Sequence, residues 1–142
     1  MQIKPYEHKV QYYETDKMGI VHHSNYIRWF EEARVDYLEQ VGRPYESVEE
    51  AGVICPVISV ECRYRTMTHF GDRVLVKLWV EKFNGVRLVI RYQISDKESG
   101  EVRCTGSSTH CYLDESGKLV NLKDVDRTLF DIYKEDLNTH SR

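Results

Sequence analysis

The sequence predicts an α+β fold in which a curved antiparallel sheet of about five strands wraps one long central helix, with another helix at the C-terminus. Three observations support this prediction. Apolar residues follow a helical spacing from about residue 24 to residue 41, a period of two begins after Gly52, and tight-turn sequences separate the later strands. A helix of about 17 residues is roughly 25 Å long, which matches strands of about 8 to 12 residues.

The composition limits the class of protein. The 142 residues fit a single domain, 1–142, and the chain is 41% hydrophobic and 30% charged, as in ordinary globular domains. Lys and Arg number 20 against 23 Asp and Glu, so the basic footprint of a nucleic-acid-binding protein is missing. No apolar run is long enough to span a bilayer, and the first residues lack the apolar core of a signal peptide. We therefore expect a cytoplasmic protein that binds neither nucleic acid nor membrane.

The N-terminal third should form a strand, a polar loop and the long helix. Residues 8–13 have the composition of a short strand, and a short helical turn is expected at 45–51. Ser24 or Asn25 can cap the first amides of the long helix, and Gly42 should end it. The predicted apolar face of the helix consists of Ile27, Phe30, Ala33, Tyr37, Leu38 and Val41, with Arg34 as a charged exception on the same face.

The remainder should form four antiparallel strands and a helix. The dipeptide Asn84-Gly85 is the strongest hairpin signal in the chain. The last strand is rich in small residues at 105–109, which would let the central helix approach closely. The expected strands are 58–65, 74–80, 88–94 and 101–114, followed by a helix at 124–137.

Each strand places alternate apolar residues on the face toward the helix. A second apolar set lies on the opposite face, so the C-terminal helix or another subunit should cover it. The predicted inner rows are Ile58, Val60, Cys62 and Tyr64, then Val74, Val76, Leu78 and Val80, then Leu88, Ile90, Tyr92 and Ile94, and the outer set is Leu75, Trp79, Val89 and Leu113.

The loop before the long helix is the candidate catalytic segment. It brings Asp16, His22 and His23 to the N-terminal end of a helix, where a developing negative charge is stabilised. Asp16 can be an ordinary turn residue that Gly19 continues, or a carboxylate that activates water or attacks a substrate directly. His22 is interpreted as a solvated loop residue.

The sequence indicates no metal site. Adjacent histidines rarely bind one ion together, and the cysteines show no zinc-type spacing. We interpret the cysteines as free thiols and expect no metal or other cofactor. Four arginines fall on outward strand positions, where they form either ordinary solvated surface or a patch that binds phosphates: Arg63, Arg65, Arg87 and Arg91.

The segment from Asp16 to Arg34 carries the pattern D-x-x-G-x-V-x-H-x-N-Y-x-x-W-F-E-x-A-R. This pattern resembles the loop-helix motif of the 4-hydroxybenzoyl-CoA thioesterase family of hotdog-fold acyl-CoA thioesterases, and in particular its bacterial branch. The F-G-D turn at 70–72 and the strand order over 8–137 also fit. The resemblance implies a hotdog fold and an enzyme that hydrolyses an acyl-CoA to a free carboxylic acid and CoA.

The resemblance also implies roles for particular residues. Asp16 falls on the catalytic carboxylate of the family, and the backbone N–H of His23 falls on the group that polarises the thioester carbonyl. Members form homodimers or homotetramers with active sites between subunits. The residues expected to bind the substrate are Gly19, Asn25, Tyr26 and Tyr64, with Lys82 and Arg87 near the CoA phosphates.

Two other functions remain open at this point. A hotdog dehydratase would act on hydroxyacyl thioesters, usually with a histidine and an acid paired across the dimer. A non-catalytic acyl-CoA-binding module would keep the pocket without needing Asp16. The presence of Asp16 favours the hydrolase, and the sequence does not define the acyl group.

Overall fold

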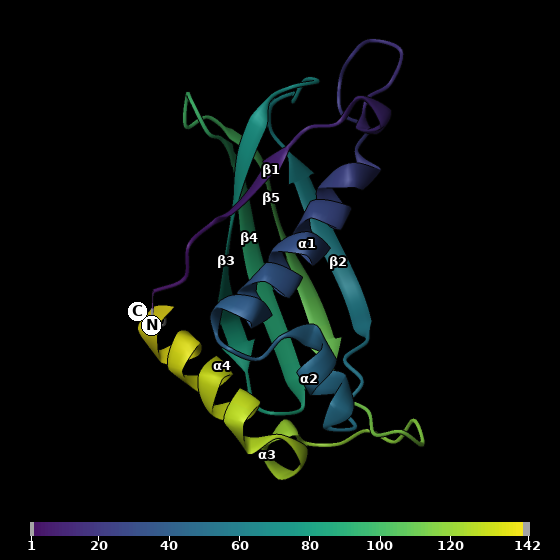
Figure 1. The fold of residues 1–142 in the computed structure, drawn as a ribbon, viewed down its shortest axis with the longest axis vertical. Coiled ribbons are helices and arrows are strands. Elements are labelled where there is room, and N and C mark those ends of the chain that lie inside the picture. Colours follow the sequence, from purple (N-terminus) through teal and green to yellow (C-terminus); the bar gives the residue numbers. More distant parts are fainter. Residues whose placement is uncertain (1, 141–142) are drawn as a thin grey trace.

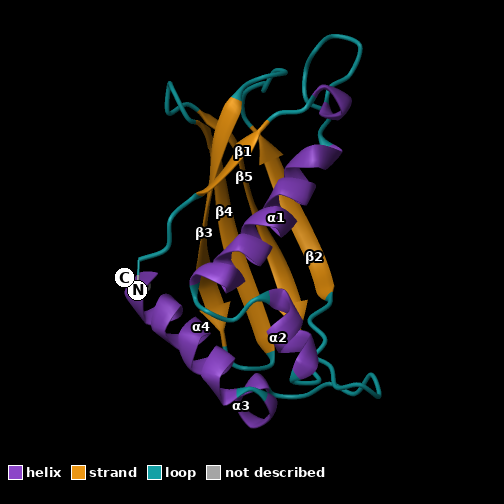
Figure 2. Cartoon of the chain, viewed as in Figure 1, coloured by secondary structure: helices purple, strands orange, loops and turns teal. Residues whose placement is uncertain are grey.

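The computed structural model describes residues 2–140. One long helix, α1, crosses one face of a five-stranded sheet, and the C-terminal helix α4 runs beside the lower end of that sheet (Figures 1 and 2). The elements are β1 (Tyr6–Lys9), a 3-10 turn (Tyr12–Glu14), α1 (Ser24–Gln40), α2 (Tyr45–Glu50), β2 (Val57–Tyr64), β3 (Arg73–Phe83), β4 (Arg87–Asp96), β5 (Val102–Cys111), α3 (Leu122–Val125) and α4 (Arg127–His140).

The sheet has the strand order β1-β3-β4-β5-β2, and all neighbouring strands are antiparallel. This arrangement confirms the predicted hotdog architecture. The hairpin at Asn84-Gly85 is confirmed as well, because the Asn84 N–H donates to the carbonyl of Arg87 at 3.2 Å. Every helix within residues 2–140 is too short or too polar to span a bilayer.

The core forms between α1 and the inner face of the sheet. Trp29 and Phe30 are fully buried, and the Phe30 ring stacks on Tyr92 with centroids 4.1 Å apart. A Cβ at Gly106 would lie 2.8 Å from the Phe30 ring, so the small residues of β5 do allow the predicted close approach. The predicted inner rows of β3 and β4 are buried apart from Leu78, which is partly exposed.

The two ends of α1 are built differently. At the C-terminal end Gly42 has φ +80°, its N–H donates to Glu39 and the Arg43 N–H donates to Leu38, which is a Schellman motif. At the N-terminal end the prediction of a Ser24 or Asn25 cap is wrong. His23 occupies the cap position with no side-chain cap. The hydroxyl of Ser24 contacts His22 Nδ1 instead, and the side-chain oxygen of Asn25 accepts from Arg28.

Three predicted boundaries are also wrong. The first strand is Tyr6–Lys9 rather than 8–13, because the chain turns at Tyr12–Glu14, where the Glu14 side chain accepts from the Gln11 amide. The last strand ends at Cys111. The C-terminal helix is interrupted at Asp126, which pairs with Arg43, so α3 and α4 replace the single helix expected at 124–137.

Strand β2 forms an edge of the sheet. It pairs with β5 alone, and Cys62 lies opposite Gly106, so the inward row is placed as predicted. However, α1 covers this row only in part: Cys62 packs against the core and Tyr64 lies near Tyr26. Several apolar side chains of β2 remain exposed: Val57 by 45%, Ile58 by 47%, Val60 by 37% and Tyr64 by 47%.

The outer face of the sheet is only partly covered. Helix α4 packs its apolar residues into the core, where Tyr133 lies near Tyr37 and Phe83. Of the predicted outer set, Trp79 stacks on His140 near the end of α4 at 6.3 Å between ring centroids. All four members of that set remain partly exposed: Leu75, Trp79, Val89 and Leu113.

Candidate active site

The loop before α1 is a small closed structure. Thr15 pairs with Val21, the Asp16 N–H donates to the carbonyl of Ile20 at 2.8 Å, and Gly19 adopts φ +74° at the turn. The Val21 N–H then donates to Thr68 at 2.9 Å, which attaches the loop to the segment before β3. Gly19 therefore has a clear conformational role, since residues other than glycine rarely adopt a positive φ.

Asp16 is exposed at the start of this turn. Its Oδ1 accepts from the Met18 N–H at 2.8 Å and from the Ile20 N–H at 3.3 Å. Its Oδ2 makes no hydrogen bond to any of the residues 2–140. One oxygen thus fixes the orientation of the carboxylate, and the other is free for a ligand or a water molecule.

The start of α1 leaves a backbone donor available. The His23 N–H donates to no described residue, and the His23 carbonyl accepts from the Tyr64 hydroxyl at 3.2 Å. His22 is occupied locally, because its Nδ1 lies 2.9 Å from the Ser24 hydroxyl and its ring stacks on His23. A free amide at a helix N-terminus is suited to stabilise a negative oxygen.

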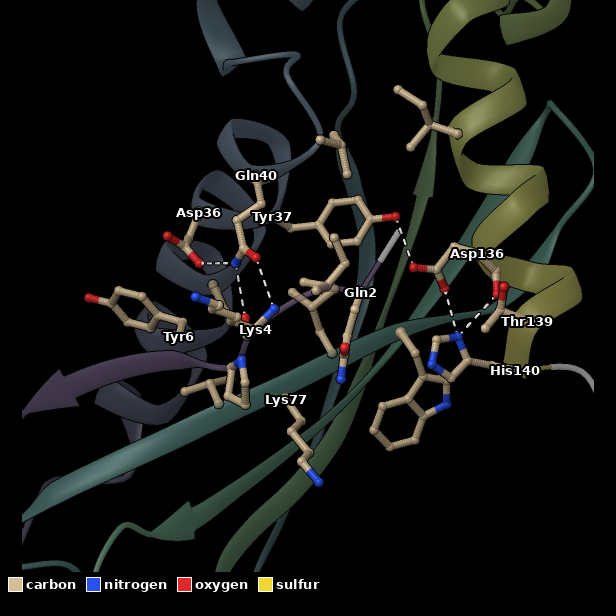
Figure 3. Close-up of a pocket in the computed structure, with 18 of the residues that line it drawn as sticks. Gln2, Lys4, Tyr6, Asp36, Tyr37, Gln40, Lys77, Asp136, Thr139 and His140 are labelled. Carbon is tan, nitrogen blue, oxygen red and sulfur yellow. Dashed lines mark hydrogen bonds and ion pairs between the residues drawn. The ribbon is translucent and has the colours of Figure 1, made fainter.

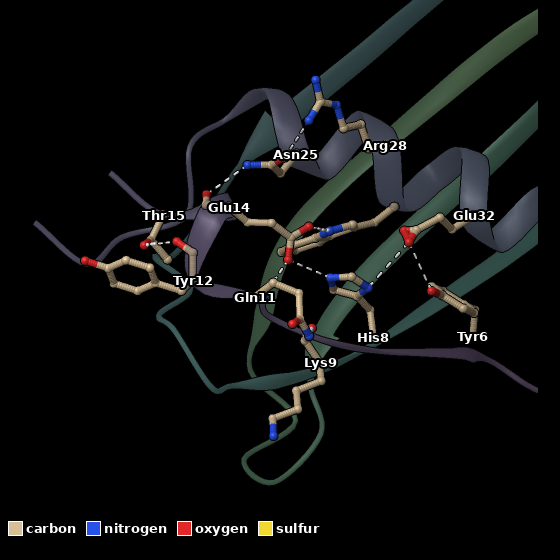
Figure 4. A network of polar contacts seen from close by, with 11 residues as sticks. Tyr6, His8, Lys9, Gln11, Tyr12, Glu14, Thr15, Asn25, Arg28 and Glu32 are labelled. Carbon is tan, nitrogen blue, oxygen red and sulfur yellow. Dashed lines mark hydrogen bonds and ion pairs between the residues drawn. The ribbon is translucent and has the colours of Figure 1, made fainter. Parts of the chain in front are cut away.

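Glu14 anchors the loop to the rest of the fold (Figure 4). Its buried carboxylate accepts from Trp29 Nε1 at 2.7 Å and from the Gln11 N–H at 2.8 Å, and it contacts His8 Nε2 at 2.8 Å. Its carbonyl accepts from the His22 N–H and from the Asn25 side chain. Burial acts to raise the pKa of Glu14, but these hydrogen bonds outweigh burial and hold the pKa below its usual value.

Sequence reasoning missed Glu14. The available signal was Trp29 in the first turns of the predicted helix, because a buried indole N–H normally finds an acceptor. The acceptor is 15 residues away in sequence, and spacing alone does not identify it.

The predicted substrate-binding residues of α1 have internal partners. Asn25 is buried and donates to the Glu14 carbonyl at 2.8 Å, and Tyr26 is buried with its hydroxyl 3.0 Å from Thr68 Oγ1. These contacts hold the loop in place. Tyr64 is different, because its side chain is about half exposed beside His23, within reach of a ligand at the helix start.

Lys82 and Arg87 lie at the other end of the sheet. The loop of Asp16 joins the start of β3, where Ile20 pairs with His69, whereas Lys82 is near the end of that strand. Nine residue steps of strand between Arg73 and Lys82 correspond to roughly 30 Å. The structure therefore does not bring these two cationic residues to Asp16 within one chain.

A hollow at the opposite end of α1 also lies apart from this loop. It measures about 840 Å³ and lies between the N-terminal segment, the second half of α1, β3 and α4 (Figure 3). Asp136 organises one wall, since it accepts from the Val80 N–H at 2.8 Å and from the Tyr37 hydroxyl at 2.9 Å. None of the predicted site residues lines it. Within residues 2–140, no cluster of three or more His, Cys, Asp or Glu is arranged to hold a metal ion.

A five-stranded antiparallel sheet around one helix, with the loop of Asp16 at the start of that helix, is the architecture of a hotdog-fold thioesterase. Residues 10–129 match the family model described as the thioesterase-like superfamily. The chain belongs to this superfamily and is a thioester hydrolase.

Three particular relatives are informative. The structure of a DHNA-CoA thioesterase from Staphylococcus aureus is similar with a TM-score of 0.89 at 33% identity, over 98% of this chain and 95% of that one. YneP of Bacillus subtilis, provisionally named an acyl-CoA thioesterase, is 35% identical over 81% of this chain and 83% of its own. A 1,4-dihydroxy-2-naphthoyl-CoA hydrolase of Prochlorococcus marinus is 25% identical over 78% of this chain and 77% of its own.

Proposed function

We propose that the chain hydrolyses an acyl-CoA thioester to a free carboxylic acid and CoA, with Asp16 as the catalytic carboxylate. One observation carries this proposal: a carboxylate oriented through Oδ1, with Oδ2 free, lies on the loop that leads into the unpaired His23 N–H. The relatives named above act on, or are named for, acyl-CoA substrates, which supports the choice of substrate class.

The proposed chemistry uses few groups. The His23 N–H donates to the thioester carbonyl oxygen and stabilises the negative charge that develops there. Asp16 either takes a proton from a water molecule, whose oxygen attacks the carbonyl carbon, or attacks that carbon itself to form an anhydride that water then hydrolyses. In both routes the carbon–sulfur bond breaks and CoA leaves as its thiol. Neither route requires a cofactor.

We also propose which kind of acyl group the substrate carries. The motif from Asp16 to Arg34 resembles that of the 4-hydroxybenzoyl-CoA thioesterase family, and the relatives named above include a 1,4-dihydroxy-2-naphthoyl-CoA hydrolase. We therefore propose an aromatic or short acyl group. Release of free thiol from a panel of aromatic, short, branched and long acyl-CoAs tests this directly.

The same panel separates the alternatives. Hydrolysis of at least one acyl-CoA supports the thioesterase. Binding of acyl-CoA analogues without hydrolysis of any member would make the binding module the better description. Conversion of 3-hydroxyacyl thioesters to enoyl thioesters, followed by the ultraviolet absorbance of the product, would favour the dehydratase.

We also propose that the chain forms at least a homodimer through the free edge of β2. An unpaired strand edge readily pairs with another chain, and this edge is lined by exposed apolar residues. Two exposed residues of α1, Ile27 by 40% and Val35 by 38%, add to the apolar surface. Pairing here could bring Lys82 and Arg87 of one subunit to the Asp16 loop of a neighbour in a larger assembly.

Light scattering at micromolar concentration tests the assembly. A mass at least twice the 16.8 kDa of the chain supports the dimer. A purely monomeric protein that still hydrolyses acyl-CoA would contradict it.

A further inference from the structure

A second cavity lies between α1, α2 and the inner face of the sheet. It has a volume of about 280 Å³, and no residue of the Asp16 loop lines it. Most of its walls are apolar side chains, among them Val35, Leu88 and Ile90. Its polar lining includes Arg34, His110 and Tyr112, and also the carboxylate residue Glu31, one turn earlier on α1. Neither the fold nor the proposed hydrolysis explains why these groups face an apolar cavity.

The first of these groups is a guanidinium without a counter-ion. Arg34 is partly buried, and no carboxylate among residues 2–140 lies within ion-pair distance of it. Its only hydrogen bond to a described residue runs from Nη1 to the Tyr92 hydroxyl at 2.9 Å. A partly desolvated charge is normally paired, so this guanidinium is available to an anion.

A chain of hydrogen bonds leads from Arg34 to His110 beneath the helix. The Tyr92 hydroxyl lies 2.6 Å from the Ser108 hydroxyl, which lies 2.7 Å from His110 Nε2. A guanidinium can only donate, so the Tyr92 oxygen accepts from Arg34. Ser108 is the only described acceptor for the Tyr92 hydrogen, so we assign Tyr92 as the donor to Ser108. Ser108 then donates to His110 Nε2, which makes Nε2 an acceptor.

This direction determines the tautomer of His110. Burial, and then the charge of Arg34, lower the pKa of His110 to about 4, so its ring is neutral near pH 7. A neutral ring that accepts at Nε2 carries its hydrogen on Nδ1. His110 is 2% exposed, and its Nδ1 has no partner among the described residues.

Tyr112 supplies the third donor. Its side chain is fully buried, and its hydroxyl also lacks a partner among the described residues. A buried donor without an acceptor costs stability, and native structures usually supply the acceptor as protein, water or ligand. The lining of the cavity therefore combines apolar walls with three groups that have hydrogens to donate, Arg34, His110 and Tyr112, and with one carboxylate, Glu31.

We propose that this cavity binds a compact organic anion, a carboxylate on a small apolar body, with Arg34 as its counter-ion and with the unpaired donors of His110 and Tyr112 buried in its wall. Water alone would accept hydrogen bonds from the donors but would leave the apolar walls exposed to water. A cavity of about 150 Å³ accepts benzene, so about 280 Å³ accommodates one or two rings with a carboxylate.

The cavity lies apart from the Asp16 loop of the same chain. Arg34 follows His23 by 11 residues along α1, which corresponds to about 16 Å. The anion could be the free acid that hydrolysis releases, or an acidic substituent on the acyl group of a thioester bound by a neighbouring subunit. Binding to the cavity does not depend on the proposed function, so the two proposals can fail separately.

Calorimetric titration of the full chain with benzoate and 2-naphthoate tests the site. The uncharged controls are benzamide and 2-naphthamide, which have nearly the same shape. We expect at least one of the carboxylates to bind with one site per chain and its amide to bind on the order of tenfold more weakly or not at all. Equal binding of acid and amide, or no binding of either acid at millimolar concentration, would overturn the proposal.

Variants then assign the binding to Arg34. Arg34→Met should weaken carboxylate binding by on the order of tenfold, and Arg34→Lys, which keeps the charge without the planar fork, should weaken it less. Glu31→Gln is the matched control, because Glu31 is one turn earlier on α1, lines the same cavity and has the opposite charge. It should leave binding unchanged or tighter. Unchanged binding by a folded Arg34→Met protein, verified by circular dichroism, would remove Arg34 from the site.

Inhibition kinetics separate the two sources of the anion. If the cavity holds released acid, 2-naphthoate should inhibit noncompetitively with acyl-CoA, and Arg34→Met should relieve that inhibition. If the cavity holds an acyl substituent, inhibition should be competitive. Both patterns support the site, whereas carboxylate inhibition that Arg34→Met leaves unchanged contradicts it.

Discussion

The Glu14 carboxylate accepts a 2.7 Å hydrogen bond from the indole N–H of Trp29, and this contact ties the loop carrying Asp16 to the helix that begins beside His23. Glu14 lies two residues before Asp16, and Trp29 lies on the buried side of α1. The position of the exposed Asp16 carboxylate therefore depends on a buried contact.

Glu14→Gln should lower both stability and turnover. A glutamine has one acceptor oxygen where Glu14 uses two, so at least one of the donors from Trp29, Gln11 and His8 loses its acceptor. We expect the free energy of unfolding to fall by about 1–3 kcal/mol and kcat to fall with little change in KM. Urea unfolding and steady-state hydrolysis measure the two effects.

Glu32→Gln is the matched control for Glu14. The Glu32 carboxylate lies at the partly exposed end of the same network, 3.6 Å from His8 Nδ1. Its loss should leave kcat close to the wild-type value. An equal loss of kcat in both variants would contradict a specific role of Glu14 in positioning the Asp16 loop.

Asp16→Asn should nearly abolish hydrolysis. The amide keeps the size of the side chain and the Oδ1 contacts but removes the charge, so neither a base nor a nucleophile remains. Loss of a general base alone costs roughly 10²–10⁴ in rate. Affinity for a non-hydrolysable acyl-CoA analogue should stay near the wild-type value.

His23→Ala should reduce hydrolysis less than Asp16→Asn, because the backbone N–H remains. Wild-type turnover by the Asp16→Asn protein would refute the catalytic assignment. Comparison of kcat and analogue affinity for the three proteins separates catalysis from binding.

Arg87→Ala should raise KM severalfold with little change in kcat, because phosphate contacts contribute to ground-state binding. Arg65→Ala is the informative comparison, since Arg65 is also exposed but follows β2 near Tyr64. A rise in KM for Arg65→Ala alone would place the CoA phosphates at the Asp16 end of the same chain.

Asp126→Asn should remove an acid-sensitive part of the stability. Arg43 donates two hydrogen bonds of 2.7 and 2.6 Å to Asp126, and these lower the pKa of Asp126 against the effect of burial. The variant should lose on the order of 3 kcal/mol at pH 7 because Arg43 stays largely buried without its partner.

The pH dependence of that loss has a definite sign. A lowered pKa in the folded state means that the stabilisation is complete above the unfolded pKa, about 3.9, and is lost as the pH falls through the folded value. The difference in unfolding free energy between wild type and Asp126→Asn should be constant from about pH 5 to 8 and shrink below about pH 4. A difference that grows on acidification would contradict the pairing.

Gly106→Ala should destabilise the core. The new methyl group would lie 2.8 Å from the Phe30 ring and also against the Glu61 carbonyl, which belongs to the backbone of β2 and cannot easily move. Overpacking of this kind costs about 1–3 kcal/mol. Ser107→Ala, one residue later on the other face of β5, should change stability much less, and denaturant unfolding compares the two.

The sequence alone predicted those parts of the molecule that depend on residues close together in the chain. The apolar spacing of α1 predicted its extent, Gly42 predicted its end, and the alternation in β3 and β4 predicted their buried rows. These features follow from periods of 3.6 and 2, which can be read within a short window. The motif from Asp16 to Arg34 indicated the thioesterase superfamily for the same reason.

Only the tertiary structure decided which polar groups meet. Arg34 reaches Tyr92 across 58 positions of sequence, and Arg43 reaches Asp126 across 83. The partner of a buried polar group is set by which strands and helices lie side by side, and spacing within a segment contains no information on that. For this reason only the tertiary structure shows three features of the site. These are the contacts of Glu14, the position of Arg34 beside its cavity without a carboxylate partner, and the separation of Lys82 from Asp16.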